Sequence, residues 1–121
     1  MKGLNIEDYQ ISFGKEQNKR TYYFTQLISS ASIKMEGRVQ RHCVAGYINS
    51  CANGKTSIWS MSITDYIGIN KNLLTIEISP DKRIVQCRGK LNRLANKQEW
   101  SIIERFAYER NLTIPRWVTY S

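Results

Sequence analysis

The feature that most constrains the fold of this chain is a pair of alternating segments joined by a short turn. Residues 73–79 and 83–91 flank Pro80 and Asp81, a residue pair typical of a tight turn between antiparallel strands. A two-residue turn sets a register in which apolar residues share one face and polar residues share the other. In that register Leu74 lies opposite Cys87, Ile76 opposite Val85 and Thr75 opposite Gln86, with Glu77 and Arg88 also on the polar face. We therefore expect an antiparallel sheet with one apolar face.

Three further segments have the period-two alternation of strands. Residues 9–13 and 21–27 are separated by a polar stretch, so they predict a second hairpin. Residues 57–63 place Trp59 and Met61 on one side and serines on the other. These segments extend the predicted sheet.

Two helices are predicted from apolar residues that recur at steps of three and four. The first runs from residue 36 to residue 52, after a serine-rich break at residues 29–32, and Asn53-Gly54 ends it. Its apolar stripe is Val39, Cys43, Val44, Tyr47, Ile48 and Cys51, and its opposite side carries Arg38, Arg41, His42, Ala45 and Asn49. The second begins at a capping box of Asn96 and Glu99 and ends near Asn111.

These elements predict an α+β fold, with a mainly antiparallel sheet and two principal helices covering one face. The length of 121 residues matches one domain. We expect a single domain over residues 1–121, in which Pro115 makes residues 112–121 an extended C-terminal tail. Trp117 and Tyr120 of this tail are expected to dock on the domain or on a partner.

The charge of the chain points to polyanionic partners. Lysine and arginine total 18 against 10 acidic residues, a net charge of +8, which is a strong positive field for a small domain. Basic and amide side chains alternate along residues 86–92, a layout suited to binding phosphates or bases. The predicted anion-binding set is Arg38, Arg41, Lys55, Arg83, Gln86, Arg88, Lys90, Asn92 and Arg93. No aromatic residue that would stack on a base is evident on this face.

Several classes of protein do not fit the sequence. No apolar run approaches the roughly 20 residues of a membrane span, and residues 1–8 lack the basic-then-apolar layout of a signal peptide. The three cysteines include no CxxC pair and the single histidine cannot supply a multi-histidine site, so no structural zinc site is expected. The glycine patterns of nucleotide-binding loops and the motifs of serine hydrolases and zinc proteases do not occur. We expect a cytoplasmic protein with reduced thiols, no cofactor, no metal and no membrane partner.

A catalytic interpretation centres on His42. Its neighbour Cys43 is interpreted as a core residue, because adjacent residues on a helix point about 100° apart and form no dyad. His42 beside Arg38 and Arg41 could bind phosphate or transfer a proton. Glu36 and Glu77 are the acids to consider with it.

Two blocks of the sequence resemble a known family. The first is Met35-Glu36-Gly37, then Gln40 to Tyr47, then Cys51 to Ser60, and the second is Leu74 to Ile78 followed by Ile84 to Asn92. Together they resemble the core of PcfJ-like proteins over residues 22–110. The family positions matched are Glu36, His42, Cys43, Tyr47, Gly54, Glu77, Gln86, Arg88 and Asn92. The resemblance implies a product of a conjugative plasmid, an integrative element or a phage.

Three functions are compatible with these observations. The first is a nucleic-acid-binding module that contacts DNA or RNA through the basic residues. The second is an enzyme acting on nucleic acid or nucleotide, with His42 and Glu77 in acid–base roles and Gln86 and Arg88 holding an anion. The third is an inhibitor of a host defence system, of the anti-CRISPR type, that binds a host protein or ribonucleoprotein. The sequence leaves open whether the chain is catalytic and what its oligomeric state is.

Overall fold

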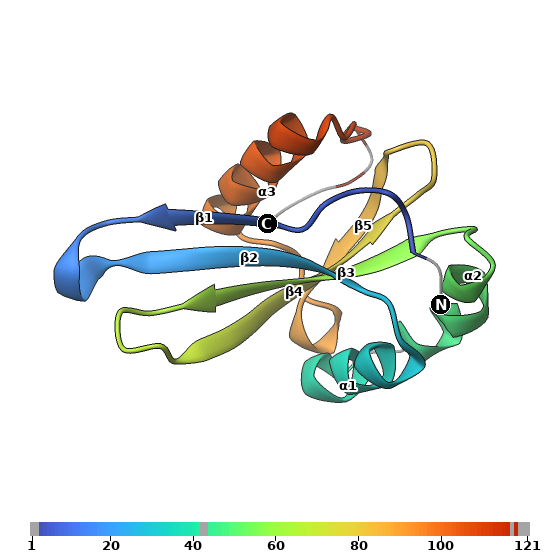
Figure 1. Ribbon diagram of the computed structural model, residues 1–121, viewed down its shortest axis with the longest axis horizontal. Helices are drawn as coiled ribbons and strands as arrows, with labels where there is room; N and C mark the ends of the chain where they lie inside the picture. The colour runs from blue at the N-terminus through green and yellow to red at the C-terminus, as the bar shows by residue number, and fades with distance from the viewer. Residues whose placement is uncertain (1–2, 42–43, 117, 119–121) are drawn as a thin grey trace.

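The computed structural model describes residues 3–41, 44–116 and 118, and in these the chain forms one five-stranded antiparallel sheet with helices on both sides (Figure 1). The strands follow one another across the sheet in chain order, β1 to β5. They are β1 (Tyr9–Phe13), β2 (Arg20–Leu27), β3 (Ser57–Thr64), β4 (Asn70–Ile78) and β5 (Ile84–Arg88). The α-helices are α1 (Ser30–Gln40), α2 (Ile48–Ala52) and α3 (Lys97–Arg110). Short 3-10 turns are η1 (Glu16–Asn18), η2 (Val44–Tyr47) and η3 (Lys90–Asn92).

The main core lies between the sheet and α3. Phe106 of α3 stacks on Phe24 of β2, with ring centroids 4.2 Å apart, and lies 5.5 Å from the Trp59 ring of β3. All three side chains are fully buried. The predicted capping box forms, since the Asn96 side chain accepts from Glu99 N and the Glu99 carboxylate accepts from Asn96 N. The second predicted helix is therefore confirmed, and Trp100, Ile103, Phe106 and Ala107, the residues expected on its apolar side, are buried.

The opposite face of the sheet is covered by α1 and α2. The Thr75 hydroxyl of β4 donates to the Glu36 carboxylate of α1, and Ile33, Cys51 and Ile58 form a second, smaller core beneath these helices. Because Thr75 and Ile76 are consecutive in a strand, they point to opposite faces, and Ile76 belongs to the α3 core. The α+β class and the antiparallel sheet are confirmed. The principal helices, however, lie on opposite faces and not together on one (Figure 1).

The first helix differs from its predicted bounds. The α1 helix begins at Ser30, because the Ser29 side chain accepts from Ser32 N and the Ser32 hydroxyl accepts from Ser29 N. The serine-rich run is thus a capping box and not a break. The helix ends at Gln40, since Arg41 adopts the left-handed conformation with φ 54°, and α2 begins only at Ile48. The prediction of one continuous helix over residues 36–52 was wrong.

The register between β4 and β5 also differs from the prediction. Ile76 pairs with Cys87, Glu77 with Gln86, and Thr75 with Arg88. The turn has three residues, because Ser79 N bonds Arg83 O and Lys82 is left-handed, which is a common hairpin geometry. An irregularity between Glu77 and Ile78 adds a second offset. The two offsets together shift the pairing by an even number of residues, so the predicted faces are retained although the predicted partners are not.

The segment after α3 packs against the rest of the chain. Thr113 forms a parallel bridge to Arg83, with Ile84 N donating to Thr113 O at 2.9 Å. Leu112 and Val118 are buried in the main core. The predicted docking residues Trp117 and Tyr120, like His42 and Cys43, lie outside the described residues. Within the described residues, no helix is both long and apolar enough to pass through a membrane.

Candidate functional site

Polar side chains lie beside the second, smaller core, between α1, η2, α2 and the sheet. We call this set the polar layer, and it consists of Glu36, Tyr47, Cys51, Thr56, Ser60, Thr75 and Glu77. Strand alternation brings β3 and β4 residues to this face, since Ser60 pairs with Thr75 and Ile58 with Glu77.

Glu36 occupies the buried end of the polar layer, with 4% of its surface exposed. The hydroxyl of Thr75 lies 2.5 Å from its Oε2, and the hydroxyl of Ser60 also bonds the carboxyl group. Burial raises the pKa of Glu36, and the two hydroxyl contacts oppose that effect without cancelling it. A carboxyl group held in this way can keep or release a proton in response to its surroundings.

Glu77 is the second carboxyl group of the layer and is only half buried. The Thr56 hydroxyl donates to its Oε2 at 2.7 Å, and the Tyr47 hydroxyl is a further hydrogen-bond partner. Burial raises the pKa of the Tyr47 phenol, and the negative charge of Glu77 adds to the effect. The same two causes raise the pKa of the Cys51 thiol. Glu77 therefore acts as the shared acceptor of this part of the layer.

The end of α1 carries an unusual polar group. Gln40 lies one turn after Glu36 and is 2% exposed, and its Nε2 has no hydrogen-bond partner among the described residues. Buried polar groups normally have partners because an unsatisfied donor costs about 1–3 kcal/mol. His42, two residues after Gln40 in the sequence, lies outside the described residues.

Four of the predicted anion-binding residues lie on two neighbouring elements. Arg38 and Arg41 are exposed at the end of α1, and Lys90 and Asn92 are exposed on η3. These elements lie side by side (Figure 1). We call this surface the α1–η3 surface. Sequence reasoning had placed Arg38 and Arg41 on one side of a longer helix, and the structure places them beside a turn that follows β5.

The remaining predicted residues are more dispersed. Gln86 is exposed and pairs across the sheet with Glu77, while half-buried Arg88 donates to Cys87 O at 3.1 Å. Arg83 lies in the β4–β5 turn, 3.2 Å from Asp81. Lys55 is exposed between α2 and β3.

Arg93 has a different environment from the other predicted cations. Its two terminal nitrogens each lie 2.8 Å from a Glu99 carboxylate oxygen, and Nη2 also donates to Leu73 O. The hydrogen bonds that Arg93 donates to the Glu99 carboxylate raise the pKa of Arg93. The guanidinium is thus bound by Glu99 and Leu73, although the side chain is partly exposed, and it ties the end of η3 to the start of α3.

Sequence reasoning missed three members of this region. Thr56 was assigned no role, Gln40 was noted only as part of a motif, and Tyr47 was interpreted as part of an apolar stripe. The signal that could have found Thr56 and Tyr47 is their position on either side of α2, which brings both to Glu77 once α2 folds back on the sheet. The packing of α2 against the sheet is a tertiary contact, which the local sequence does not indicate.

The comparisons with known proteins give one match. The family model described as PcfJ-like protein matches residues 5–103, most of the chain. No curated protein and no solved structure matches. Among the described residues there is also no group of three or more histidine, cysteine, aspartate or glutamate side chains that could hold a metal ion.

Proposed function

The chain belongs to the PcfJ-like protein family, and we propose that it is a nucleic-acid-binding module of a mobile genetic element. The observation that carries the proposal is an excess of exposed cations that have no acidic partner. The chain has 18 lysine and arginine residues, and the described residues contain three ion pairs. Unpaired surface cations release counterions from nucleic acid when they contact its phosphates, and this drives binding.

The distribution of acids strengthens this field. Two of the ten acidic residues, Glu36 and Glu99, are buried, and Glu77 is half buried in the polar layer. Glu99 is already paired with Arg93, whereas Glu36 and Glu77 form no ion pair with a surface cation among the described residues. The exposed cations there are therefore largely unpaired.

The α1–η3 surface is the part of the basic surface that we propose contacts phosphates. Arg38, Arg41 and Lys90 are exposed there and form no ion pair among the described residues. Asn92 adds an amide that can donate to a phosphate or a base. Arg93 is left out of this surface because Glu99 already holds its guanidinium.

Fluorescence anisotropy with labelled single-stranded and duplex DNA and RNA across a salt series tests the proposal. We expect affinity to fall steeply with salt. The double variant Arg38→Ala/Lys90→Ala is expected to reduce the slope of log K against log salt by about 2 on duplex DNA. The control Lys82→Ala/Arg116→Ala removes one lysine and one arginine from exposed positions elsewhere. Its slope of log K against log salt should stay close to that of the wild type.

Two results would contradict the proposal in different ways. An equal loss in both double variants would show that binding has no preferred surface. Absence of binding at any salt would refute nucleic-acid binding and direct attention to a protein partner, such as a component of host defence.

A second candidate, an enzyme acting on nucleic acid or nucleotide, is favoured by the two carboxyl groups in one polar layer. Glu36 has a raised pKa, and Glu77 accepts hydrogen bonds from a threonine and a tyrosine, so the two groups are in different environments, as acid–base pairs require. The sequence-based assignment gives the acid–base roles to Glu77 and to His42, which lies outside the described residues, with Arg88 and Gln86 holding the anion. Glu36 is the second carboxyl group of the polar layer. Cleavage of the anisotropy probes with magnesium, lost in folded His42→Ala and Glu77→Gln variants, would support this candidate. Unchanged cleavage in both variants would exclude it.

A further inference from the structure

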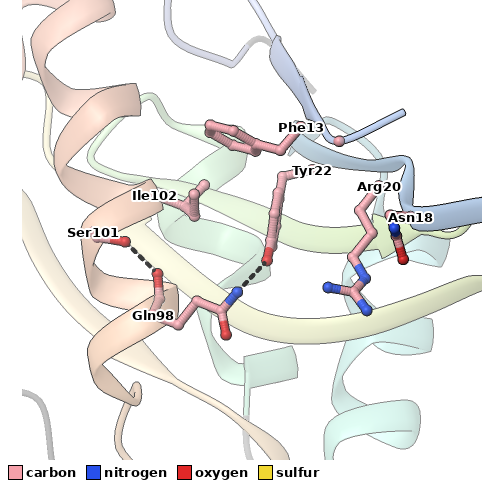
Figure 2. A pocket seen from close by; sticks show the side chains of 8 residues that line it. Phe13, Asn18, Arg20, Tyr22, Gln98, Ser101 and Ile102 are labelled. Atoms are coloured by element: carbon pink, nitrogen blue, oxygen red, sulfur yellow. Dashed lines mark hydrogen bonds between the residues drawn. The ribbon is translucent and has the colours of Figure 1, made fainter. Parts of the chain in front are cut away.

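A separate pocket of about 320 Å³ lies on the other side of the sheet, between the β1–β2 connection and the start of α3 (Figure 2). This volume is at the lower end of the range for small-ligand sites, about 300–1,000 Å³. Its lining residues are Phe13, Gly14, Asn18, Arg20, Tyr22, Gln98, Ser101 and Ile102. None of them belongs to the anion-binding set predicted from the sequence.

The walls of the pocket combine apolar and hydrogen-bonding groups. Phe13 is 43% exposed and meets the Tyr22 ring edge-to-face, with centroids 6.2 Å apart. Ile102 of α3 lies beside them (Figure 2). The Tyr22 hydroxyl accepts a long hydrogen bond of 3.4 Å from Gln98 Nε2, which is the only bond of the Gln98 side-chain amide among the described residues. An aromatic surface and an amide with free bonding capacity therefore open onto the same space.

Arg20 supplies the charge of the pocket. It is the first residue of β2, pairs with Phe13 across the hairpin, and is exposed. Its guanidinium forms no hydrogen bond or ion pair with the residues that the structure describes. The connection over residues 14–20 also carries Lys15 and Lys19 against one acid, Glu16, all exposed, so its net charge is positive.

The wall formed by the β1–β2 connection is closely packed. Gly14 has φ +80°, and a Cβ atom there would lie 2.3 Å from Asn18 O. Only glycine fits this position without moving the backbone. A side chain at position 14 would therefore displace the connection that carries Phe13 and Arg20.

We propose that this pocket binds one unpaired nucleotide of a single-stranded nucleic acid. The base stacks on Phe13, its polar edge bonds the Gln98 amide and the Tyr22 hydroxyl, and the phosphate contacts Arg20. Stacking on an aromatic face requires a base that has left a duplex, since paired bases are already stacked on their neighbours. The inference rests on the proposed function and narrows it to single strands. Because α1 and α3 lie on opposite faces of the sheet, this pocket and the α1–η3 surface can be tested independently.

The test compares a labelled oligothymidylate of about 12 nucleotides with an abasic oligomer of the same length, using anisotropy at constant salt. The full chain is expected to bind oligothymidylate about tenfold more tightly, because only this probe carries bases to stack. Phe13→Ala should remove that preference, and Phe13→Leu, which keeps apolar volume but no aromatic face, should remove most of it. Tyr108→Ala deletes an aromatic residue that is 80% exposed on α3, and this control should keep the preference.

Arg20→Ala should weaken binding of both oligomers to a similar degree, because a phosphate contact does not depend on the base, and Arg116→Ala is its matched control. Oligouridylate in place of oligothymidylate distinguishes RNA from DNA. Equal affinity of the wild-type chain for the base-containing and abasic probes would overturn the pocket assignment while leaving the proposed function standing. Binding of neither probe nor any duplex would overturn the proposed function itself.

Discussion

Replacing Glu99 with glutamine is expected to destabilise the protein by about 2 kcal/mol, because it removes the charge that holds Arg93. Both Glu99 oxygens accept from Arg93 at 2.8 Å, and Oε1 also accepts from Asn96 N at 2.9 Å. Glutamine keeps an oxygen that can accept from Asn96 N, but it replaces the other carboxylate oxygen with an NH2 group, which cannot accept from the guanidinium. Breaking a fully buried pair costs about 3–5 kcal/mol. The Arg93 side chain is 41% exposed, so water replaces part of the lost contact and the cost falls below that range.

The pH dependence gives the prediction a specific signature. Burial alone raises the pKa of Glu99, but hydrogen bonds from Arg93 and from Asn96 N and the charge of Arg93 lower it below its ordinary value of 4.5. A carboxyl group with a lowered folded-state pKa contributes stability that is complete above its ordinary pKa and is lost as pH falls through the folded-state pKa. The difference in stability between wild type and Glu99→Gln should therefore be constant near neutrality and shrink below about pH 4.5.

Urea denaturation followed by circular dichroism measures this difference, and a thermal scan should show a midpoint lower by about 8 °C. Glu109→Gln is the matched control, because Glu109 lies 3.8 Å from Arg105 in an exposed pair and its loss should cost less than about 0.5 kcal/mol. A Glu99→Gln variant as stable as this control, or a stability difference that does not depend on pH, would refute the reasoning.

Three other predictions concern parts of the molecule away from this pair. Glu36→Gln should raise the free energy of unfolding at neutral pH by up to about 1 kcal/mol, because the raised pKa of Glu36 means that its ionisation opposes folding as pH rises. Urea titrations at several pH values should show that this gain vanishes in acid. A variant less stable than wild type at neutral pH would contradict the prediction. Gly14→Ala should cost at least about 2 kcal/mol, since its Cβ would lie 2.3 Å from Asn18 O in addition to the strain of φ +80°. Gly68→Ala, with φ +89° and no atom within 4 Å, should cost about 1 kcal/mol, and equal thermal midpoints for the two variants would argue against the steric account. The Cys87 thiol is fully buried, and burial raises its pKa to about 12. It should therefore resist alkylation by iodoacetamide in the native protein and react in urea, which peptide mass spectrometry measures. Rapid labelling of the native protein would contradict this by showing that the core around Cys87 opens.

The sheet was largely predictable because alternation is a local pattern. The period of two in β3, β4 and β5 assigned Met61, Ile76 and Cys87 to the apolar face, where they are buried. The pairing of β4 with β5 was not predictable, because it depends on a three-residue turn and on an irregularity beside Glu77. Together these two offsets shift the pairing by an even number of residues, so the partners change while the faces stay the same.

The helices were also predictable only where the signal is local in the sequence. The start of α3 was predicted from its capping box, in which all contacts lie within three residues. The start of α1 uses the same device with two serines, and it was missed because serine also favours turns. The end of α1 at Arg41 was missed because a non-glycine residue with positive φ leaves no mark in the sequence.

The sequence by itself determined the strands, the polar and apolar face of each strand, the α3 helix, the family and the excess of positive charge, because each follows from local periodicity, from composition or from motif residues in order. The tertiary structure alone decided that both faces of the sheet are covered and that Glu36 contacts Thr75, 39 residues away in the chain. It also decided that Arg93 is paired with Glu99, whereas Arg20 forms no ion pair among the described residues. These outcomes depend on which distant groups come into contact and which of them stay exposed to solvent. Burial and ion pairing of this kind are properties of the packed chain, so neighbouring residues in the sequence do not report them.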